Sequence, residues 1–234
     1  NENFAEAKRT VAALLNYGAA AQTNFDIGTD DLANVITEEL ARKLYPNYTD
    51  AEIANAVAGV ATYTTAYAEG MLDPADELDE TIVGEFVRDM DICTSRTRAL
   101  ALEGNILMNY RCKFALNNIS TVKAAYWTEE RVAEIKAKGE VLTLENASLV
   151  VDAAPDGDRY LHAYGFASCD LDQTLYSTMV ATTEDGQVHS SGIMAYSPYA
   201  YLQGKVNDSD ANLAALSRAV VVYGAMAKEQ FVNN

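Results

Sequence analysis

The sequence predicts an α+β protein in which an antiparallel β-sandwich of about seven or eight strands packs with N-terminal helices and a C-terminal helix. Apolar residues recur at helical spacing near both ends of the chain. From about residue 82 the apolar period changes to two, and turn-forming residues separate the alternating segments. We expect residues 1–80 to be mainly helical, residues 81–197 to form the sandwich, and residues 198–234 to carry the C-terminal helix. Because no Gly/Ser-rich or Pro-rich linker separates them, these parts should form one cooperative unit.

The two terminal helices carry matching residues. The first helix is expected over about residues 2–24, and its small residues 18–21 allow another helix to approach closely. The matched pairs share one offset (223 − 17 = 206): Tyr17 with Tyr223, Gly18 with Gly224, Ala21 with Ala227, and Phe25 with Phe231. Such a repeat indicates one structural unit with a boundary helix at each end. We expect the two faces to pack on each other or to meet copies on a neighbouring molecule.

Two further helices and an acidic loop are expected before the sandwich. Asp30 or Thr29 can cap a helix that ends before Pro46, and Thr49 fits a capping box that opens a third helix. The acidic stretch 69–80 is typical of a linking loop. Calcium capture by the acidic run at residues 73–80 is an alternative, although the spaced ligands and central glycine of an EF-hand are missing.

Alternating segments from about residue 82 onwards predict the strands. Three short turns, at residues 103–105, 156–157 and 185–186, contain Gly with Asn or Asp, which tolerate the positive φ of hairpins. The expected strands are residues 86–93, 98–102, 106–114, 121–127, 140–152, 159–168, 174–183 and 187–196. Short antiparallel strands with such turns indicate a β-sandwich.

Helices are expected inside and after the sandwich. A short helix over residues 129–138 should end at Gly139, a usual C-cap residue. Pro198 opens a helical turn, and Asp208 or Ser209 can cap the last helix.

Charge and hydropathy exclude several partner classes. The formal net charge of −17 argues against binding nucleic acid or anionic lipid, which need a positive surface. No run of about 18 apolar residues occurs, so no membrane insertion is expected. The first residues lack the basic and apolar regions of a signal peptide, so an exported chain would here be in its mature form.

Five short segments, spread over most of the chain, carry a recognisable combination of residues. They are residues 14–25 (LLNYGAAAQTNF), 28–34 (GTDDLAN), 100–106 (LALEGNI), 165–168 (GFAS) and 196–200 (YSPYA). This set resembles a module of secreted and cell-surface proteins of Gram-positive bacteria, whose helix reads roughly LLNYGAAAQ-x-YF. The resemblance implies export and display beside enzymatic or adhesive modules. It carries no agreed catalytic residues, so it assigns no catalytic, cofactor-binding or metal-binding residue here.

The histidines, serines and acidic pairs of the sequence do not favour any particular enzymatic reaction. His162 and His189 lie in predicted strands without a nearby metal-ligand partner, so structural roles are favoured over zinc ligation across strands. No serine lies in a G-x-S-x-G elbow, which disfavours a serine hydrolase. The acidic pairs at residues 156–158 and 170–172 are typical of turns, although a carboxylate pair for glycoside hydrolysis stays open.

The three cysteines leave two alternatives. Cys93, Cys112 and Cys169 make an odd count without a CxxC pair, which argues against a zinc ribbon or a thioredoxin motif. Each can be a small buried thiol. One disulfide plus a spare thiol stays open if the strands concerned are neighbours.

These observations predict a non-enzymatic extracellular structural or interaction module without a cofactor. Its partner would be protein, with self-assembly through the terminal helices or strands, and carbohydrate binding by exposed aromatic rings is the alternative. A glycosidase-type enzyme is a second alternative. The candidate interaction residues are Tyr17, Gly18, Tyr223, Gly224, Trp127, Tyr196, Tyr199 and Tyr201.

Overall fold

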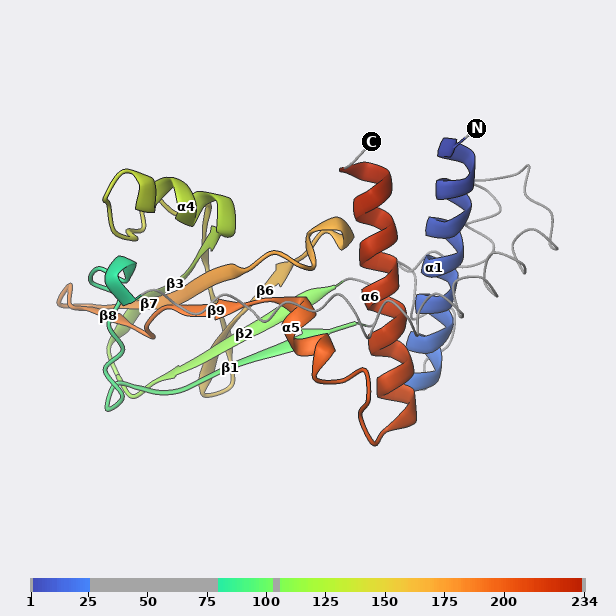
Figure 1. Cartoon of the computed structure of the whole chain (residues 1–234). Helices are drawn as coiled ribbons and strands as arrows, with labels where there is room; N and C mark the ends of the chain where they lie inside the picture. Colours follow the sequence, from blue (N-terminus) through green and yellow to red (C-terminus); the bar gives the residue numbers. More distant parts are fainter. Residues whose placement is uncertain (1, 26–79, 103–105, 233–234) are drawn as a thin grey trace.

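The computed structural model describes residues 2–25, 80–102 and 106–232, in which two antiparallel sheets pack beside a pair of terminal helices (Figure 1). This confirms the α+β class with a sandwich and a C-terminal helix. The second and third predicted helices, most of the acidic loop and the turn at residues 103–105 lie outside the described residues.

The elements follow the predicted order. The helices are α1 (Glu2–Phe25), η1 (Glu80–Ile82), α4 (Glu129–Ala137), η2 (Ser168–Asp170), α5 (Pro198–Gln203) and α6 (Ala211–Phe231). The strands are β1 (Cys93–Ala101), β2 (Leu107–Phe114), β3 (Ile119–Thr128), β4 (Leu149–Asp152), β5 (Ala154–Asp156), β6 (Arg159–Gly165), β7 (Leu175–Thr183), β8 (Val188–Ser190) and β9 (Met194–Tyr196).

The strand order is that of an immunoglobulin-type sandwich. One sheet has the order β1-β2-β6-β5, and the other has β4-β3-β7-β8, with β9 pairing β7 as well. These orders correspond to the A-B-E-D and C′-C-F-G sheets of that architecture. Turns at Gly157 and Gly186 connect neighbouring strands with φ of 63° and 83°, which confirms the predicted hairpin turns.

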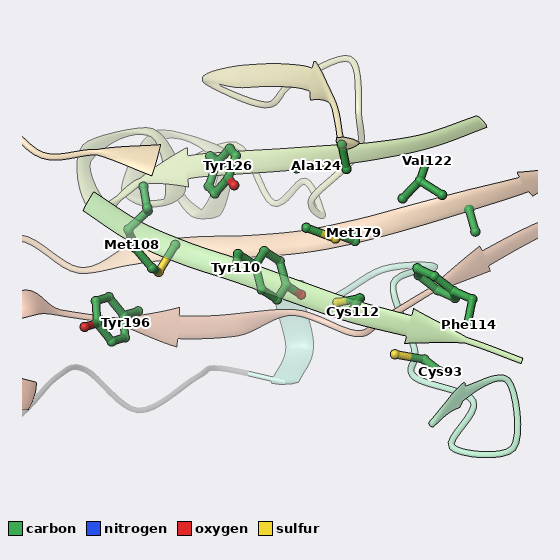
Figure 2. Packing of buried hydrophobic residues seen from close by; sticks show 13 residues of the cluster. Cys93, Met108, Tyr110, Cys112, Phe114, Val122, Ala124, Tyr126, Met179 and Tyr196 are labelled. Carbon is green, nitrogen blue, oxygen red and sulfur yellow. The ribbon is translucent and has the colours of Figure 1, made fainter. Parts of the chain in front are cut away.

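Alternation in β2 builds the core between the sheets. Its residues Met108, Tyr110, Cys112 and Phe114 are buried, and the residues between them are half-buried. They meet Met179 and other buried residues of the opposite sheet (Figure 2). The alternation of apolar residues in the sequence therefore identifies the face of this sheet that lies towards the core.

Strand β7 is buried on both faces because helix α4 covers the outer face of its sheet. Tyr176 and Val180 pack there with Trp127 of β3 and with Val132 and Ile135 of α4. This explains why β7 is almost continuously buried and has little polar alternation.

Helix α6 packs between α1 and the sandwich. The N-terminal end of α1 and the C-terminal end of α6 lie at the same end of the pair, so the two helices are antiparallel (Figure 1). The Tyr17 and Tyr223 rings stack with centroids 5.9 Å apart, and the Tyr17 hydroxyl donates to the Leu102 carbonyl at 2.8 Å. Of the two expected arrangements, the structure shows the pairing within one chain.

Two expected strand segments are irregular. Residues 86–92 contribute a single parallel bridge, between Arg88 and Ser190. Residues 140–148 form no strand because the Asn146 side chain accepts from the Thr143 backbone N–H at 2.9 Å and donates to the Val141 carbonyl at 2.8 Å. Such local side-chain bonds compete with strand pairing.

The last helix begins later than predicted. Asp210 is its N-cap, and its carboxylate accepts from the backbone N–H groups of Asn212 and Leu213 at 2.9 and 3.3 Å. Asp208 instead forms an ion pair with Lys205 at 2.9 Å. Neither Asp208 nor Ser209 is therefore the cap.

The edge strand of the second sheet is interrupted at residues 191–193, between β8 and β9. The buried Ser191 hydroxyl there accepts from the Met179 backbone N–H at 2.8 Å and lies 2.7 Å from the Tyr110 hydroxyl. Arg96 of β1 reaches across the sandwich and donates to the Ser191 carbonyl at 2.8 Å. The Ser191 side chain thus accepts the hydrogen bond from the Met179 backbone N–H that a continuous edge strand would accept with a backbone carbonyl.

We expect Ser191→Ala to lower the free energy of unfolding by about 1–3 kcal/mol, because it leaves the Met179 N–H and the Tyr110 hydroxyl without their buried partner. Urea unfolding followed by circular dichroism measures this change. Ser209→Ala, at an exposed position, is the matched control and should have little effect. Equal stability of the two variants would contradict the role assigned to Ser191.

Candidate functional site

A pocket of about 220 Å³ opens where β6 ends, η2 follows and β7 begins, beside the end of β3. Its lining combines two aromatic rings, two threonines, a carboxylate and a carboxamide. These residues are Tyr164, Phe166, Thr128, Thr174, Asp170 and Gln173. A small concavity with a few convergent polar groups is the usual form of a ligand site.

The aromatic wall of the pocket continues a row of rings from the core. The Tyr164 ring lies 4.7 Å from the Tyr126 ring and 5.2 Å from the Phe166 ring, between centroids. Phe166 in turn lies 6.3 Å from the buried Tyr196 ring. Tyr164 and Phe166 are half-buried, so each is held by the row and still reaches the pocket.

The polar wall is a carboxylate with an amide beside it. The Gln173 side-chain amide donates to one oxygen of Asp170 at 3.3 Å. Burial raises the pKa of the Tyr164 hydroxyl, and the nearby Asp170 charge raises this pKa further. The hydroxyl therefore stays protonated at neutral pH and can donate a hydrogen bond, while Asp170 offers acceptors.

Three elements hold the loop that carries this wall. Glu129, in the first turn of α4, accepts from the Thr174 backbone N–H at 3.1 Å. The Leu171 carbonyl accepts from the Tyr199 backbone N–H of α5 at 3.1 Å. Lys228 of α6 forms an ion pair with Asp172. The loop is thus fixed on both sides of Asp170.

Gly224 brings α6 onto this loop. A Cβ atom at Gly224 would lie 2.8 Å from Leu171 Cδ1 and 3.1 Å from the Ser168 carbonyl oxygen. The small residue therefore serves the contact of α6 with η2, whereas its neighbour Ala225 packs against α1. The expectation that Gly224 faces the small residues of the first helix is wrong.

The other predicted interaction residues of the helices are largely covered. Tyr17 is 1 % exposed, and Gly18 is buried in α1. Tyr223 is half-buried and stacks on Tyr17. Since Tyr17 and Tyr223 stack on each other within the chain, this part of the helix face is already occupied.

Two of the predicted aromatic platforms, Trp127 and Tyr196, are buried, and the others are partly covered. Trp127 is 0 % exposed, and its indole N–H donates to Asn146 at 3.0 Å. Tyr196 is buried with the Arg98 guanidinium 5.1 Å from its ring centroid. Tyr199 is half-buried and donates to the Val221 carbonyl at 3.3 Å, and Tyr201 packs into the core clusters. Trp127 and Tyr196 therefore cannot stack on a sugar, and this prediction is wrong for them.

Sequence reasoning missed Tyr164, Phe166 and Gln173 as site residues. Asp170 was considered only as a carboxylate paired with Asp172, which instead bonds to Lys228. The available signal was the alternation of aromatic residues up to Phe166, directly followed by a polar turn. It could not identify Thr128, which arrives from a distant strand.

His162 has a structural partner. Its Nδ1 lies 2.7 Å from the Tyr126 hydroxyl, and burial lowers the pKa of the imidazole.

Among the residues that the structure describes, no three His, Cys, Asp or Glu side chains gather as a metal site, and no helix has the length and hydrophobicity to cross a membrane. No protein-family model, curated protein or solved structure matches the chain.

We expect Gly224→Ala to lower the free energy of unfolding by about 1–3 kcal/mol, because the added methyl group overpacks the contact with η2. Gly204→Ala is the matched control, since its Cβ would meet the nearest atom at 3.5 Å and its φ is −65°. The control should be neutral or stabilising. Thermal unfolding of both variants measures the difference, and equal effects would contradict the close contact.

Stability should fall as the pH decreases from about 6.5, the unfolded-state pKa of histidine, towards the lower folded-state pKa of His162. The unfolded chain binds the proton more readily in this window because burial disfavours the charged imidazole. Urea unfolding between about pH 7.5 and pH 5 measures the slope. We expect His162→Gln to flatten it, with His189→Gln as control. An unchanged slope in His162→Gln would contradict the assignment.

Proposed function

We propose that this protein is a non-enzymatic extracellular interaction module that binds a neutral carbohydrate in the pocket of Tyr164, Phe166 and Asp170. The observation that carries this proposal is the junction of two fixed aromatic rings with a carboxylate–amide pair in one small concavity. The proposal keeps the class that the sequence predicts and moves the partner from protein to sugar.

The chemistry of the pocket matches the two sides of a sugar ring. A saccharide has an apolar C–H face that can lie on an aromatic ring, and a rim of hydroxyl groups. Tyr164 and Phe166 supply the apolar contact, and tyrosine adds a polar end. Asp170 can accept from sugar hydroxyls, while the second amide hydrogen of Gln173 can donate.

Charge favours a neutral ligand. The pocket contains the carboxylate of Asp170, and the chain has a net charge of −17. The nearby cation Lys228 is already paired with Asp172. A phosphorylated or acidic ligand would therefore meet repulsion.

The same lining supports binding in preference to hydrolysis. Within the described part of the chain, Asp170 is the one carboxylate that lines the pocket. Glycoside hydrolysis ordinarily uses two carboxyl groups at a defined separation. Glu129, which follows the lining residue Thr128 in the chain, is not part of the lining, and its carboxylate accepts from the Thr174 backbone N–H.

The extracellular location is supported by the resemblance to secreted and cell-surface modules. Self-association through the matched helix faces has less support, because those faces are paired within the chain. The proposal therefore places recognition in the pocket and gives the helix pair the role of holding its loop.

A glycan array followed by calorimetric titration of the best neutral oligosaccharide tests this function. We expect Asp170→Ala to weaken binding by about ten- to a hundredfold, because a hydrogen bond to a charged group is lost. Tyr164→Ala should weaken it as well, by removing the ring surface. Asp158→Ala and Tyr160→Ala, which lie outside the pocket lining, are the matched controls.

The proposal is contradicted if no neutral glycan binds, or if Asp170→Ala binds as tightly as the unaltered protein. Preference for an acidic glycan would contradict the argument from charge. Weakening by the two control variants to the same degree would show a general loss of structure instead of a pocket contact.

A further inference from the structure

Two of the three cysteines lie together in the core. Cys93 begins β1 and Cys112 lies in β2, which pair as antiparallel neighbours. Both side chains are 0 % exposed, and both belong to the cluster between the sheets (Figure 2). The Cys112 side chain is the main cause that lowers the pKa of Cys93, and the Cys93 side chain is the main cause that raises the pKa of Cys112, so the two thiols are close neighbours. The condition that the sequence left open, neighbouring strands, is therefore met by this pair.

We propose that Cys93 and Cys112 form a disulfide bond when the chain folds in an oxidising environment, and that Cys169 stays a free thiol. The inference uses the extracellular location in the proposed function and is independent of the sugar pocket.

Strand geometry excludes Cys169 as the partner of Cys112. Cys169 follows β6, whose last residue, Gly165, pairs with Leu107 at the start of β2. Cys112 lies five residues further along β2 (112 − 107 = 5). At about 3.4 Å per residue this is about 17 Å, far beyond the reach of a disulfide.

The local backbone allows Cys93 to adjust. Cys93 pairs with Phe114, and a β-bulge lies between Cys93 and Ser95, so the regular ladder is interrupted there. Among the described strands, β1 pairs with β2 alone, and the irregular residues before β1 form a bridge at Arg88 and none at Cys93. Because Cys112 pairs with Arg96, the two cysteines are diagonal neighbours on adjacent strands, and a shift of the backbone at this strand start would bring their sulfur atoms to bonding distance.

Neighbouring charges favour the reactive form of one thiol. The hydrogen bond from Cys112 lowers the pKa of Cys93 to about 7 against the effect of burial, and the guanidinium groups of Arg88 and Arg96 contribute. Arg88 is held in place by two bonds to the Cys93 carbonyl, at 3.0 and 2.7 Å. A thiolate near neutral pH is the species that attacks a disulfide.

The oxidant is an external disulfide, either a small molecule or an oxidoreductase. Its S–S bond is first exchanged with the Cys112 thiol, which releases one reduced thiol and leaves a mixed disulfide on Cys112. The Cys93 thiolate then attacks Cys112 Sγ and expels the second thiol. Two electrons pass from the cysteines to the oxidant, and both protein thiol protons end on its two products. Because both thiols are buried in the folded protein, the external disulfide reaches Cys112 before the sandwich closes. The attack by the Cys93 thiolate completes the bond once β1 and β2 have paired and Arg88 and Arg96 lie beside Cys93.

The bond would tie an edge strand to its sheet and close a loop of 20 residues (112 − 93 + 1). Such a loop constrains the unfolded chain. We expect reduction to raise the unfolding equilibrium constant on the order of a hundredfold.

The unaltered protein, refolded in a glutathione redox buffer, provides the test. After denaturation and alkylation, peptide mapping should find Cys93 joined to Cys112 and alkyl label on Cys169 alone. The urea midpoint should fall when a reductant is added. The Cys169→Ala variant should keep this response, and the Cys93→Ala/Cys112→Ala double variant should lose it.

Alkylation of all three cysteines, or linkage through Cys169, would overturn the inference. So would a linked protein whose urea midpoint does not change on reduction. The outcome is separable from that of the proposed function: sugar binding without the linkage contradicts the disulfide alone, and linkage without sugar binding contradicts the pocket alone.

Discussion

The structure depends on helix α6 being buried on two sides. Val222, Ala225 and Met226 share a cluster with Ala12 and Ala13 of α1. Leu216, Val220 and Val221 share another cluster with Leu102 and Ile106 at the end of the sandwich and with further residues of α1. A helix that is apolar around most of its circumference is stable only between two other layers. Without α1, one face of α6 would be open to water, and the loop that Gly224 and Lys228 fix would lose its support.

The pocket follows from this layering. The row of rings from Tyr126 through Tyr164 to Phe166 begins in the core and ends where the sandwich gives way to the η2 loop. Helix α4 closes the outer face of the second sheet, and Glu129 in its first turn bonds to the loop. A concavity remains between these elements, and its walls belong to packed parts of the fold. The proposed ligand would require little ordering of side chains there, which favours affinity.

The sequence predicted what regular periods and turn chemistry encode. The alternation in β2 and the glycines of the hairpins at Gly157 and Gly186 gave strands and turns in the right places. The matched terminal residues correctly indicated a helix pair. Irregular backbone was harder to predict from the sequence, because it depends on side chains that replace the backbone hydrogen bonds between strands, as Ser191 and Asn146 do.

The site itself was hidden from the sequence for two physical reasons. Burial is decided by what covers a face, so Trp127 could not be recognised as core before α4 was placed over it. The pocket joins Thr128 to residues 164–175, and only the pairing of β3 with β7 brings these segments together.

The two ends of the sandwich are held by different contacts, and this difference determines at which end an additional covalent bond would stabilise the fold more. At one end α6, α5 and α4 hold the η2 loop by main-chain and ionic contacts. At the other end the connections are short, and the Glu184 backbone N–H donates to the Asn118 carbonyl at 2.9 Å, joining two of them. Cys93 lies towards this second end, where β1 starts after an irregular segment. A covalent tie is most useful there, because β1 is an edge strand with one neighbour, whereas the pocket end is already held by three elements.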